Sequence, residues 1–215
     1  MFDIPTKLAS PANFSVTADI EDYQTMLDYQ ARRFSLFGPI YASGDDETCE
    51  VSNATRITQA IIRINRDDIG IHKAARRRIL ICINSGGGDP IEGFGLIAAI
   101  EASETPVDIV SFGRCMSTAF LISLAGETRY ALPYTQFLLH DGDMVGMNST
   151  KKLIDWSDFA KRYEEEVIKP YVLKNGKMTE EQYVQIERKE FYMVPEDALR
   201  YGFIDRIIES LDEIL

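Results

Sequence analysis

Residues 79–100 read ILICINSGGGDPIEGFGLIAAI, and this stretch decides the fold. Its first part, 79–83, is a continuous apolar run, as in a strand buried on both faces. A glycine-rich turn follows at 84–88, and 90–102 has the apolar spacing of a helix. The stretch therefore predicts a buried strand, a glycine loop and a helix in succession.

The same unit recurs further along the chain. A second apolar run at 107–110 leads through a short loop into a helix expected over 117–125. A third buried strand is expected at 137–139, ending at His140. Continuous apolar runs that alternate with helices are typical of parallel strands covered on both faces, so the sequence predicts an α/β fold.

Further elements are expected on both sides of this centre. They are helices over 21–32, 52–64 and 155–169, a further helix beginning near 179, a short last helix beginning near 195 that precedes 203–208, and a strand over 34–37. Pro170, then Gly176, are expected to end the helix at 155–169. Thr179 and Gln182 have the spacing of a capping box.

Composition is that of one globular domain. The 215 residues are 45% hydrophobic and 27% charged, and no Pro-, Ser- or Gly-rich linker divides them. The formal net charge of -11 disfavours nucleic acid as a partner, because binding to phosphate needs a basic surface. The one basic cluster, 73–78, is interpreted as a solvated approach to a strand or a subunit contact.

The sequence lacks the features of a signal peptide, a membrane segment, a disulfide framework or a zinc site. The first residues show neither a basic nor an apolar segment of a signal peptide, and no window approaches 18 apolar residues, so a cytoplasmic protein with no membrane segment is expected. Cys49, Cys82 and Cys115 are odd in number and widely spaced, which disfavours a disulfide framework or a zinc site.

Ser117 is the candidate nucleophile. It begins a helix directly after a buried strand and a short loop, which places its hydroxyl at the positive end of the helix dipole. The amide of Thr118 and an amide of the glycine loop are positioned to stabilise an oxyanion together. A plain helix N-cap is the alternative interpretation of this serine.

His140 is the candidate general base. A serine nucleophile needs a base, and the chain has only two histidines. His72 lies in a charged loop, whereas His140 ends an apolar strand, where catalytic residues usually leave a parallel sheet. A structural role for His140 remains the alternative until it is paired with Ser117.

The glycine loop has a competing interpretation as a phosphate-binding turn. The residues 86–90 have neither the GxGxxG spacing nor a following Lys-Ser/Thr pair, and Asp89 would repel a phosphate. We interpret the glycines as backbone made available to a substrate carbonyl.

These segments together resemble ClpP, the proteolytic subunit of Clp proteases, over about residues 21–208. The segments that carry the resemblance are FSLFGPI at 34–40, ILICINSGGGDPIEGFGLIAAI at 79–100, GRCMSTAFLISLAGETRYALP at 113–133, FLLHD at 137–141 and EFYMVPEDALRYGFID at 190–205. The resemblance implies a spiral of ββα units, the ClpP/crotonase type of α/β fold, with an extended handle helix. It also implies an N-terminal arm or axial loop at 1–20 and one peptidase domain at 21–215 that includes the handle at about 143–178.

The resemblance also assigns the site. It implies Ser117 as nucleophile, His140 as base and Glu190 in the place of the family aspartate, with the amides of Gly87 and Thr118 as oxyanion donors. Two residues depart from the family pattern. Glu190 is one methylene longer than the family aspartate, and Gly86 replaces a family proline. Glu187 or Asp141 is an alternative third member of the triad.

Assembly and partners are implied in the same way. Members of the family form heptameric rings that stack into a tetradecamer. A hexameric Clp-type AAA+ ATPase supplies them with unfolded polypeptide, and ATP is used by that partner. No cofactor or metal is expected in this chain. The alternatives are a non-catalytic ring subunit, favoured by Glu190, and a crotonase-type acyl-CoA enzyme.

Overall fold

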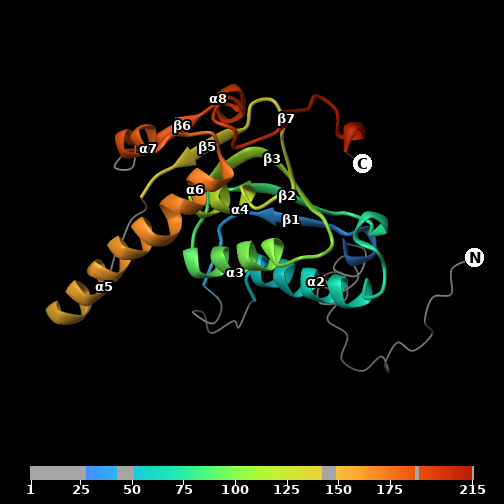
Figure 1. Ribbon diagram of the computed structural model, residues 1–215, viewed down its shortest axis with the longest axis horizontal. Coiled ribbons are helices and arrows are strands. Elements are labelled where there is room, and N and C mark those ends of the chain that lie inside the picture. Colours follow the sequence, from blue (N-terminus) through green and yellow to red (C-terminus); the bar gives the residue numbers. More distant parts are fainter. Residues whose placement is uncertain (1–27, 43–50, 142–148, 187–188, 215) are drawn as a thin grey trace, which may run out of the picture.

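The computed structural model of the 215-residue chain describes residues 28–42, 51–141, 149–186 and 189–214. The expected arm at 1–20 and most of the expected helix at 21–32 lie outside these residues, as do Cys49 and Glu187. The described part combines a mostly parallel sheet with helices, as expected for an α/β chain (Figure 1).

The sheet has seven strands within the described residues, and its main path runs β1-β2-β3-β4-β7. Their bounds are β1 Arg33–Phe37, β2 Ile79–Ser85, β3 Val107–Met116, β4 Thr128–Ala131, β5 Gln136–Leu139, β6 Phe191–Met193 and β7 Arg206–Ile207. All these pairings are parallel except that of β5 with β6. The strands expected at 34–37, 79–83 and 137–139 are confirmed.

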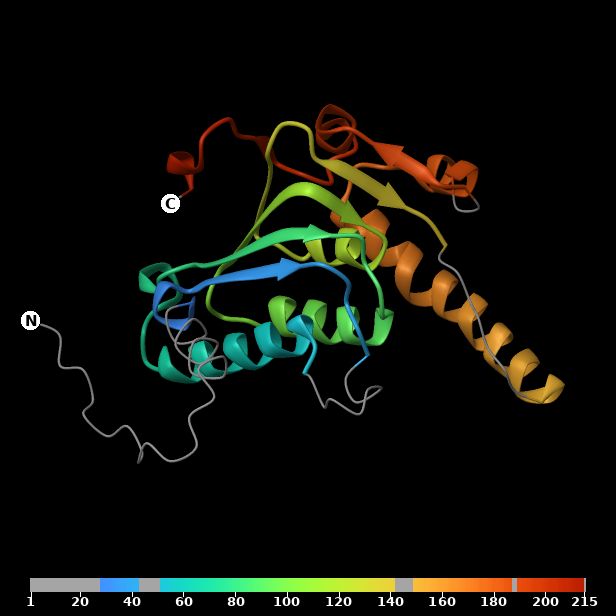
Figure 2. The ribbon, with the colours of Figure 1, turned by 180° about the vertical axis from the view of Figure 1, so that it is seen from behind.

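The helices lie beside and beyond this sheet. Their bounds are α2 Asn53–Asp67, η2 Lys73–Ala75, α3 Pro90–Glu101, α4 Thr118–Ser123, α5 Thr150–Tyr163, η3 Glu164–Ile168, α6 Lys169–Asn175, α7 Glu180–Ile186, α8 Pro195–Arg200 and η4 Leu211–Glu213. Helices α2 and α3 run side by side along one face of the sheet, and α5 projects away from it (Figures 1 and 2). The N-cap of α2 is Ser52, whose side chain accepts from the Thr55 amide at 3.1 Å.

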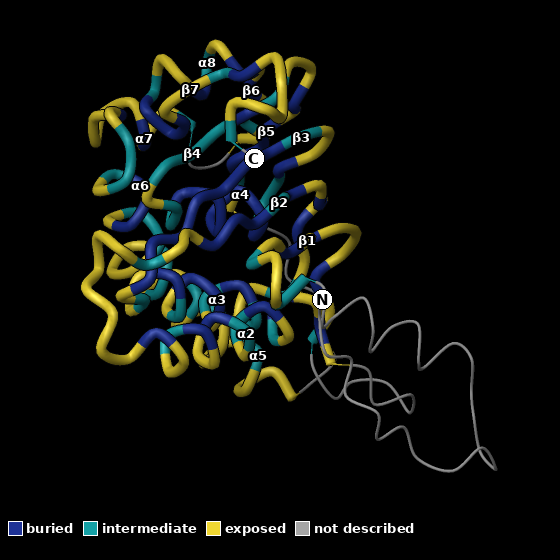
Figure 3. The backbone as a smooth tube through the Cα atoms, turned by 90° about the vertical axis from the view of Figure 1, so that its right-hand side faces the viewer, coloured by how far each residue is buried: buried dark blue, intermediate teal, exposed yellow. Residues whose placement is uncertain are grey.

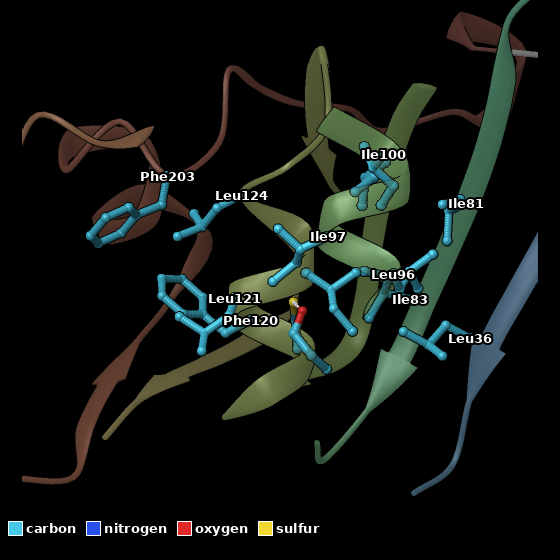
Figure 4. Close-up of a cluster of buried hydrophobic side chains, with 14 of the residues drawn as sticks. Leu36, Ile81, Ile83, Leu96, Ile97, Ile100, Phe120, Leu121, Leu124 and Phe203 are labelled. Carbon is cyan, nitrogen blue, oxygen red and sulfur yellow. Dashed lines mark hydrogen bonds between the residues drawn. The ribbon is translucent and has the colours of Figure 1, made fainter. Parts of the chain in front are cut away.

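Burial divides the two faces of the sheet unequally. The main core lies between the strands and α2, α3 and α4, and Figure 4 shows part of it, with Leu96 of α3 on the side of Ile83 and Leu36, and Ile97 on the side of Leu121 and Leu124. The opposite face carries a smaller cluster around Leu80, Val110 and Ile208. In Figure 3 the buried residues, in dark blue, lie through the centre of the molecule.

Strand β3 is longer than its apolar run predicts. The sequence predicts a loop at 111–116, but the strand continues to Met116. The reason is a second partner, because 108–111 pair with β4 whereas 114–116 pair with β5. The Asn84 side chain also accepts from the Arg114 amide at 3.1 Å, where the register between β2 and β3 shifts.

The expectation that Pro170 ends the long helix is wrong. The chain stays helical from Thr150 to Asn175, and Pro170 lies in the first turn of α6. A π-helical stretch, Glu164–Ile168, directly precedes it. A π turn shifts the hydrogen-bond ladder locally, so the missing proline N–H and the proline ring are accommodated without ending the helix. Gly176 is the C-cap, as expected.

Candidate active site

Ser117 occupies the sharp turn between β3 and α4. Its backbone has φ 55° and ψ -130°, a left-handed conformation that costs energy for any residue with a Cβ. Although it stands at the N-cap position, its side chain makes no capping hydrogen bond. The interpretation of Ser117 as an ordinary N-cap therefore loses its physical basis, since the hydroxyl does not satisfy the helix amides.

The pairing of β3 with β5 brings Ser117 and His140 to the same edge of the sheet. Met116 is paired in parallel with Leu138, and the Ser117 amide donates to the Leu138 carbonyl at 2.9 Å. His140 directly follows Leu139, the last residue of β5. Because parallel strands end at a common edge, the nucleophile candidate and the base candidate leave neighbouring strands there.

The pairing of β5 with β6 brings Glu190 to His140. Leu139 lies opposite Phe191 in this antiparallel pair, so the next positions, 140 and 190, face each other. His140 Nδ1 lies 3.1 Å from Glu190 Oε1. The glutamate side chain is 57% exposed, whereas that of the histidine is 14% exposed. The contact assigns the Nδ1–H tautomer, which leaves Nε2 available as a base.

Nε2 of His140 is buried and has no hydrogen-bond partner in the described part of the chain. It is therefore not hydrogen-bonded to Ser117 Oγ in this structure. A base must reach the proton that it abstracts, although such contacts are often formed only when substrate is present. The described site thus contains an oriented histidine that is not yet engaged with the serine.

Gly87 lies directly against the Ser117 turn. Its φ of +93° favours glycine, and a Cβ at this position would lie 2.6 Å from the Met116 carbonyl oxygen and 3.0 Å from the Thr118 amide nitrogen. The Thr118 amide belongs to the first turn of α4, where N–H groups have no partner within the helix. Gly87 and Thr118, the residues that carry the two expected oxyanion donors, therefore lie against each other.

The glycine loop is held in place by three neighbouring contacts. The Ile40 amide donates to the Gly87 carbonyl at 2.9 Å, and the Asp89 amide donates to the Ile40 carbonyl at 2.8 Å. The Thr118 hydroxyl donates to the Gly88 carbonyl at 2.8 Å. These contacts hold the loop against Ile40, which follows β1, and against α4.

Sequence reasoning missed the role of Ser85. Its hydroxyl accepts the Gly87 amide at 3.0 Å, within the buried part of the loop. The signal that could have found it is the spacing, because a serine hydroxyl commonly accepts from the amide two residues later. One of the two expected oxyanion donors is consequently engaged with another acceptor.

The second histidine, His72, and the cysteine nearest to Ser117, Cys115, take no part in this site. His72 caps η2, where its Nδ1 accepts from the Ala74 amide at 3.3 Å. It precedes β2 and so lies at the opposite end of the parallel strands from Ser117. Cys115 is buried, and burial raises the pKa of its thiol to about 11, so it stays protonated at neutral pH and does not compete as a nucleophile.

The basic cluster at 73–78 is accounted for by contacts at the start of β2. Arg78 pairs with Asp108 and with Glu127, and Arg76 donates to the Ile71 carbonyl at 3.0 Å. This agrees with its interpretation as the approach to a strand. Among the described residues, no group of three or more His, Cys, Asp or Glu side chains is close enough to hold a metal ion.

The chain is similar to known proteins of one family. Residues 54–211 match a family model described as Clp protease. An ATP-dependent Clp protease proteolytic subunit of Deinococcus radiodurans is 25% identical over 139 residues, which are 64% of this chain and 68% of the relative. A protein of the same description from Mesostigma viride is 28% identical over 174 residues, which are 80% of this chain and 72% of the relative.

Proposed function

The chain belongs to the Clp protease family, whose model covers residues 54–211, and on this premise we propose that it is a serine-type endopeptidase subunit with Ser117 as nucleophile and His140 as base. Family membership and the names of its relatives indicate a peptidase. The serine mechanism and the individual residues are the proposal.

In the proposed reaction, His140 Nε2 takes the proton of Ser117 Oγ while the oxygen attacks the peptide carbonyl carbon. The carbonyl π electrons move to its oxygen, which the amides of Gly87 and Thr118 stabilise. As the C–N bond breaks, the imidazolium gives its proton to the leaving amine and an acyl-enzyme remains. Water, deprotonated by His140, then releases the acid and restores Ser117.

The observation that carries this proposal is the contact of His140 Nδ1 with Glu190 Oε1 at 3.1 Å, together with the strained Ser117 in the turn that follows the neighbouring strand β3. A carboxylate at Nδ1 holds the ring in the tautomer that leaves Nε2 basic, and it stabilises the imidazolium that forms. Strained backbone at a nucleophile is typical of functional sites.

Assembly and partners are also proposals. We infer that the chain forms heptameric rings stacked into a tetradecamer in the cytoplasm, with a Clp-type AAA+ ATPase supplying unfolded polypeptide. Helix α5 supports self-assembly, because it has no buried residue and exposes Ile154, Trp156 and Phe159. Among the described helices, none is long and apolar enough to cross a membrane.

A non-catalytic ring subunit is the second candidate. Two observations favour it, namely that His140 Nε2 lacks a partner and that the Gly87 amide is engaged with Ser85. A subunit of this kind would keep the fold and the assembly but would not react at Ser117.

The two candidates are separated by labelling the purified full-length protein with a fluorophosphonate, which phosphonylates an activated serine. The peptidase proposal expects stoichiometric labelling that is abolished in Ser117→Ala and retained in Ser123→Ala. Ser123 is a suitable control because it is buried on the same helix and its hydroxyl donates to the Phe120 carbonyl at 2.7 Å. No labelling of the assembled wild-type ring would instead establish the non-catalytic subunit.

A further inference from the structure

The contact of Ser85 with Gly87 concerns the group on which the proposed mechanism depends. The Gly87 N–H donates to Ser85 Oγ at 3.0 Å, and both residues are buried. We propose that Ser85 is a latch on this oxyanion donor: its hydroxyl holds the Gly87 amide in the resting site and turns away when the substrate oxyanion forms. This inference rests on the proposed serine-peptidase function.

The latch and the oxyanion compete for one hydrogen. A backbone amide has a single N–H, so it cannot serve Ser85 and a developing oxyanion at full strength together. While the latch is closed, the Thr118 amide is the remaining one of the two expected donors. Loss of one such donor typically lowers turnover by about 10² to 10³. A closed latch therefore suppresses acyl transfer without disturbing Ser117 or His140.

The surroundings of the loop allow the latch to open by a side-chain rotation. The carbonyls of Gly87 and Gly88 are fixed by the Ile40 amide and the Thr118 hydroxyl, so residue 87 is held against the Ser117 turn. A serine hydroxyl has three staggered positions, and moving between them does not require the loop to move.

The size of the effect follows from one hydrogen bond. Opening the latch forfeits the Ser85 contact, which is worth about 1 kcal/mol net, and this corresponds to about fivefold in rate. Removing the hydroxyl abolishes that cost. Ser85→Ala is therefore expected to react about five times faster at Ser117, a gain that a merely structural serine would not give.

The test measures the second-order rate constant of fluorophosphonate labelling at Ser117 in full-length wild type, Ser85→Ala and Ser85→Thr. Ser85→Thr keeps the hydroxyl and is expected to react at close to the wild-type rate. Ser210→Ala is the matched control, because Ser210 makes the same kind of contact, from the Asp212 amide at 3.2 Å, beyond β7. Melting temperatures report whether each variant is folded.

A faster Ser85→Ala, with Ser85→Thr and Ser210→Ala unchanged, supports the latch. An unchanged or slower Ser85→Ala that melts like wild type overturns it, while labelling of the wild type leaves the peptidase function standing. If Ser85→Ala melts at a lower temperature, an increase in rate that Ser85→Thr does not share still supports the latch, and a decrease overturns it. No labelling of either protein overturns both the latch and the proposed function.

Discussion

Nδ1 of His140 lies 3.1 Å from Oε1 of Glu190 across the antiparallel pair of β5 and β6. Two strands of three or four residues are enough to create this contact, because Leu139 and Phe191 are already paired and the next positions must face each other. The extra methylene of glutamate is accommodated at the sheet edge, where its side chain is 57% exposed.

The contact predicts how strongly Glu190 affects reactivity. Glu190→Gln removes the negative charge that orients His140, so labelling at Ser117 is expected to slow by about 10- to 100-fold. This is less than the roughly 10⁴-fold loss for a buried triad aspartate, because solvent screens an exposed carboxylate. Fluorophosphonate kinetics at neutral pH measure the change.

Asp141→Asn is the control for Glu190. Asp141 is the alternative orienting carboxylate in the described residues, it is exposed, and its substitution removes an equal charge next to His140. We expect labelling to stay within about twofold of wild type, since the Glu190 contact remains. An equal loss in both variants would contradict the assignment of Glu190.

Two adjacent glycines are expected to respond in opposite ways to alanine. Gly87→Ala places a methyl 2.6 Å from the Met116 carbonyl oxygen at a positive φ, so the loop must move away from the Ser117 turn. Gly86→Ala meets no heavy atom within 4 Å and has no left-handed φ. We expect Gly86→Ala to raise the free energy of unfolding by about 0.5 kcal/mol by restricting the unfolded chain.

Urea unfolding and Ser117 labelling measure this pair. Gly87→Ala is expected to lose labelling by at least about 100-fold, the usual cost of an oxyanion donor. Gly86→Ala keeps labelling. Similar behaviour of the two variants would show that the close approach of residue 87 to the serine turn is not what requires glycine.

Asp68 predicts a specific loss of stability in acid. Its buried carboxylate pairs with Arg32 at 2.6 Å and accepts from the Thr105 hydroxyl at 2.8 Å, and the bond with Arg32 holds its pKa below the usual range. A lowered pKa in the folded state contributes stability that is complete above about pH 4, the value in the unfolded chain, and is lost as the pH falls through the folded value.

Asp68→Asn is therefore expected to cost roughly 2 kcal/mol at pH 7 and less at pH 3, because the wild type loses its advantage in acid. Asp158→Asn on α5 is the control, since Asp158 is 70% exposed and its substitution should leave the pH dependence unchanged. Urea unfolding at pH 3, 5 and 7 measures both. A constant difference between Asp68→Asn and wild type over this range would disprove the linkage.

An exposed aromatic residue on α5 identifies where a substitution is expected to weaken self-assembly. Phe159 is 57% exposed on a helix without buried residues, so burying it in a subunit contact would contribute about 2 kcal/mol per site. Phe159→Glu is expected to shift the protein to smaller species in sedimentation velocity, whereas Lys152→Glu, also exposed on α5, reverses a charge without removing apolar surface. Unchanged assembly in Phe159→Glu would exclude this face as the contact.

The sequence by itself determined the alternation of strands and helices, because a buried element must repeat apolar residues with its own period. It also placed Ser117 at the start of a helix that follows a buried strand and a loop, and it placed His140 directly at the end of another apolar run. The extension of β3 to Met116 and the helix that continues through Pro170 were not determined in this way. The extension of β3 depends on its pairing with β5, and the continued helix depends on the shifted hydrogen bonds of the π-helical stretch. The local sequence pattern contains neither.

Only the tertiary structure decided which side chains meet. The contact of His140 with Glu190 depends on the register of β5 and β6, which are separated by about fifty residues of chain. The partner of the Gly87 amide likewise depends on the orientation of one peptide and one hydroxyl. Hydrophobic periodicity specifies which face is buried, whereas hydrogen bonds form or fail over a few tenths of an ångström, and that distance is set by the whole packed fold.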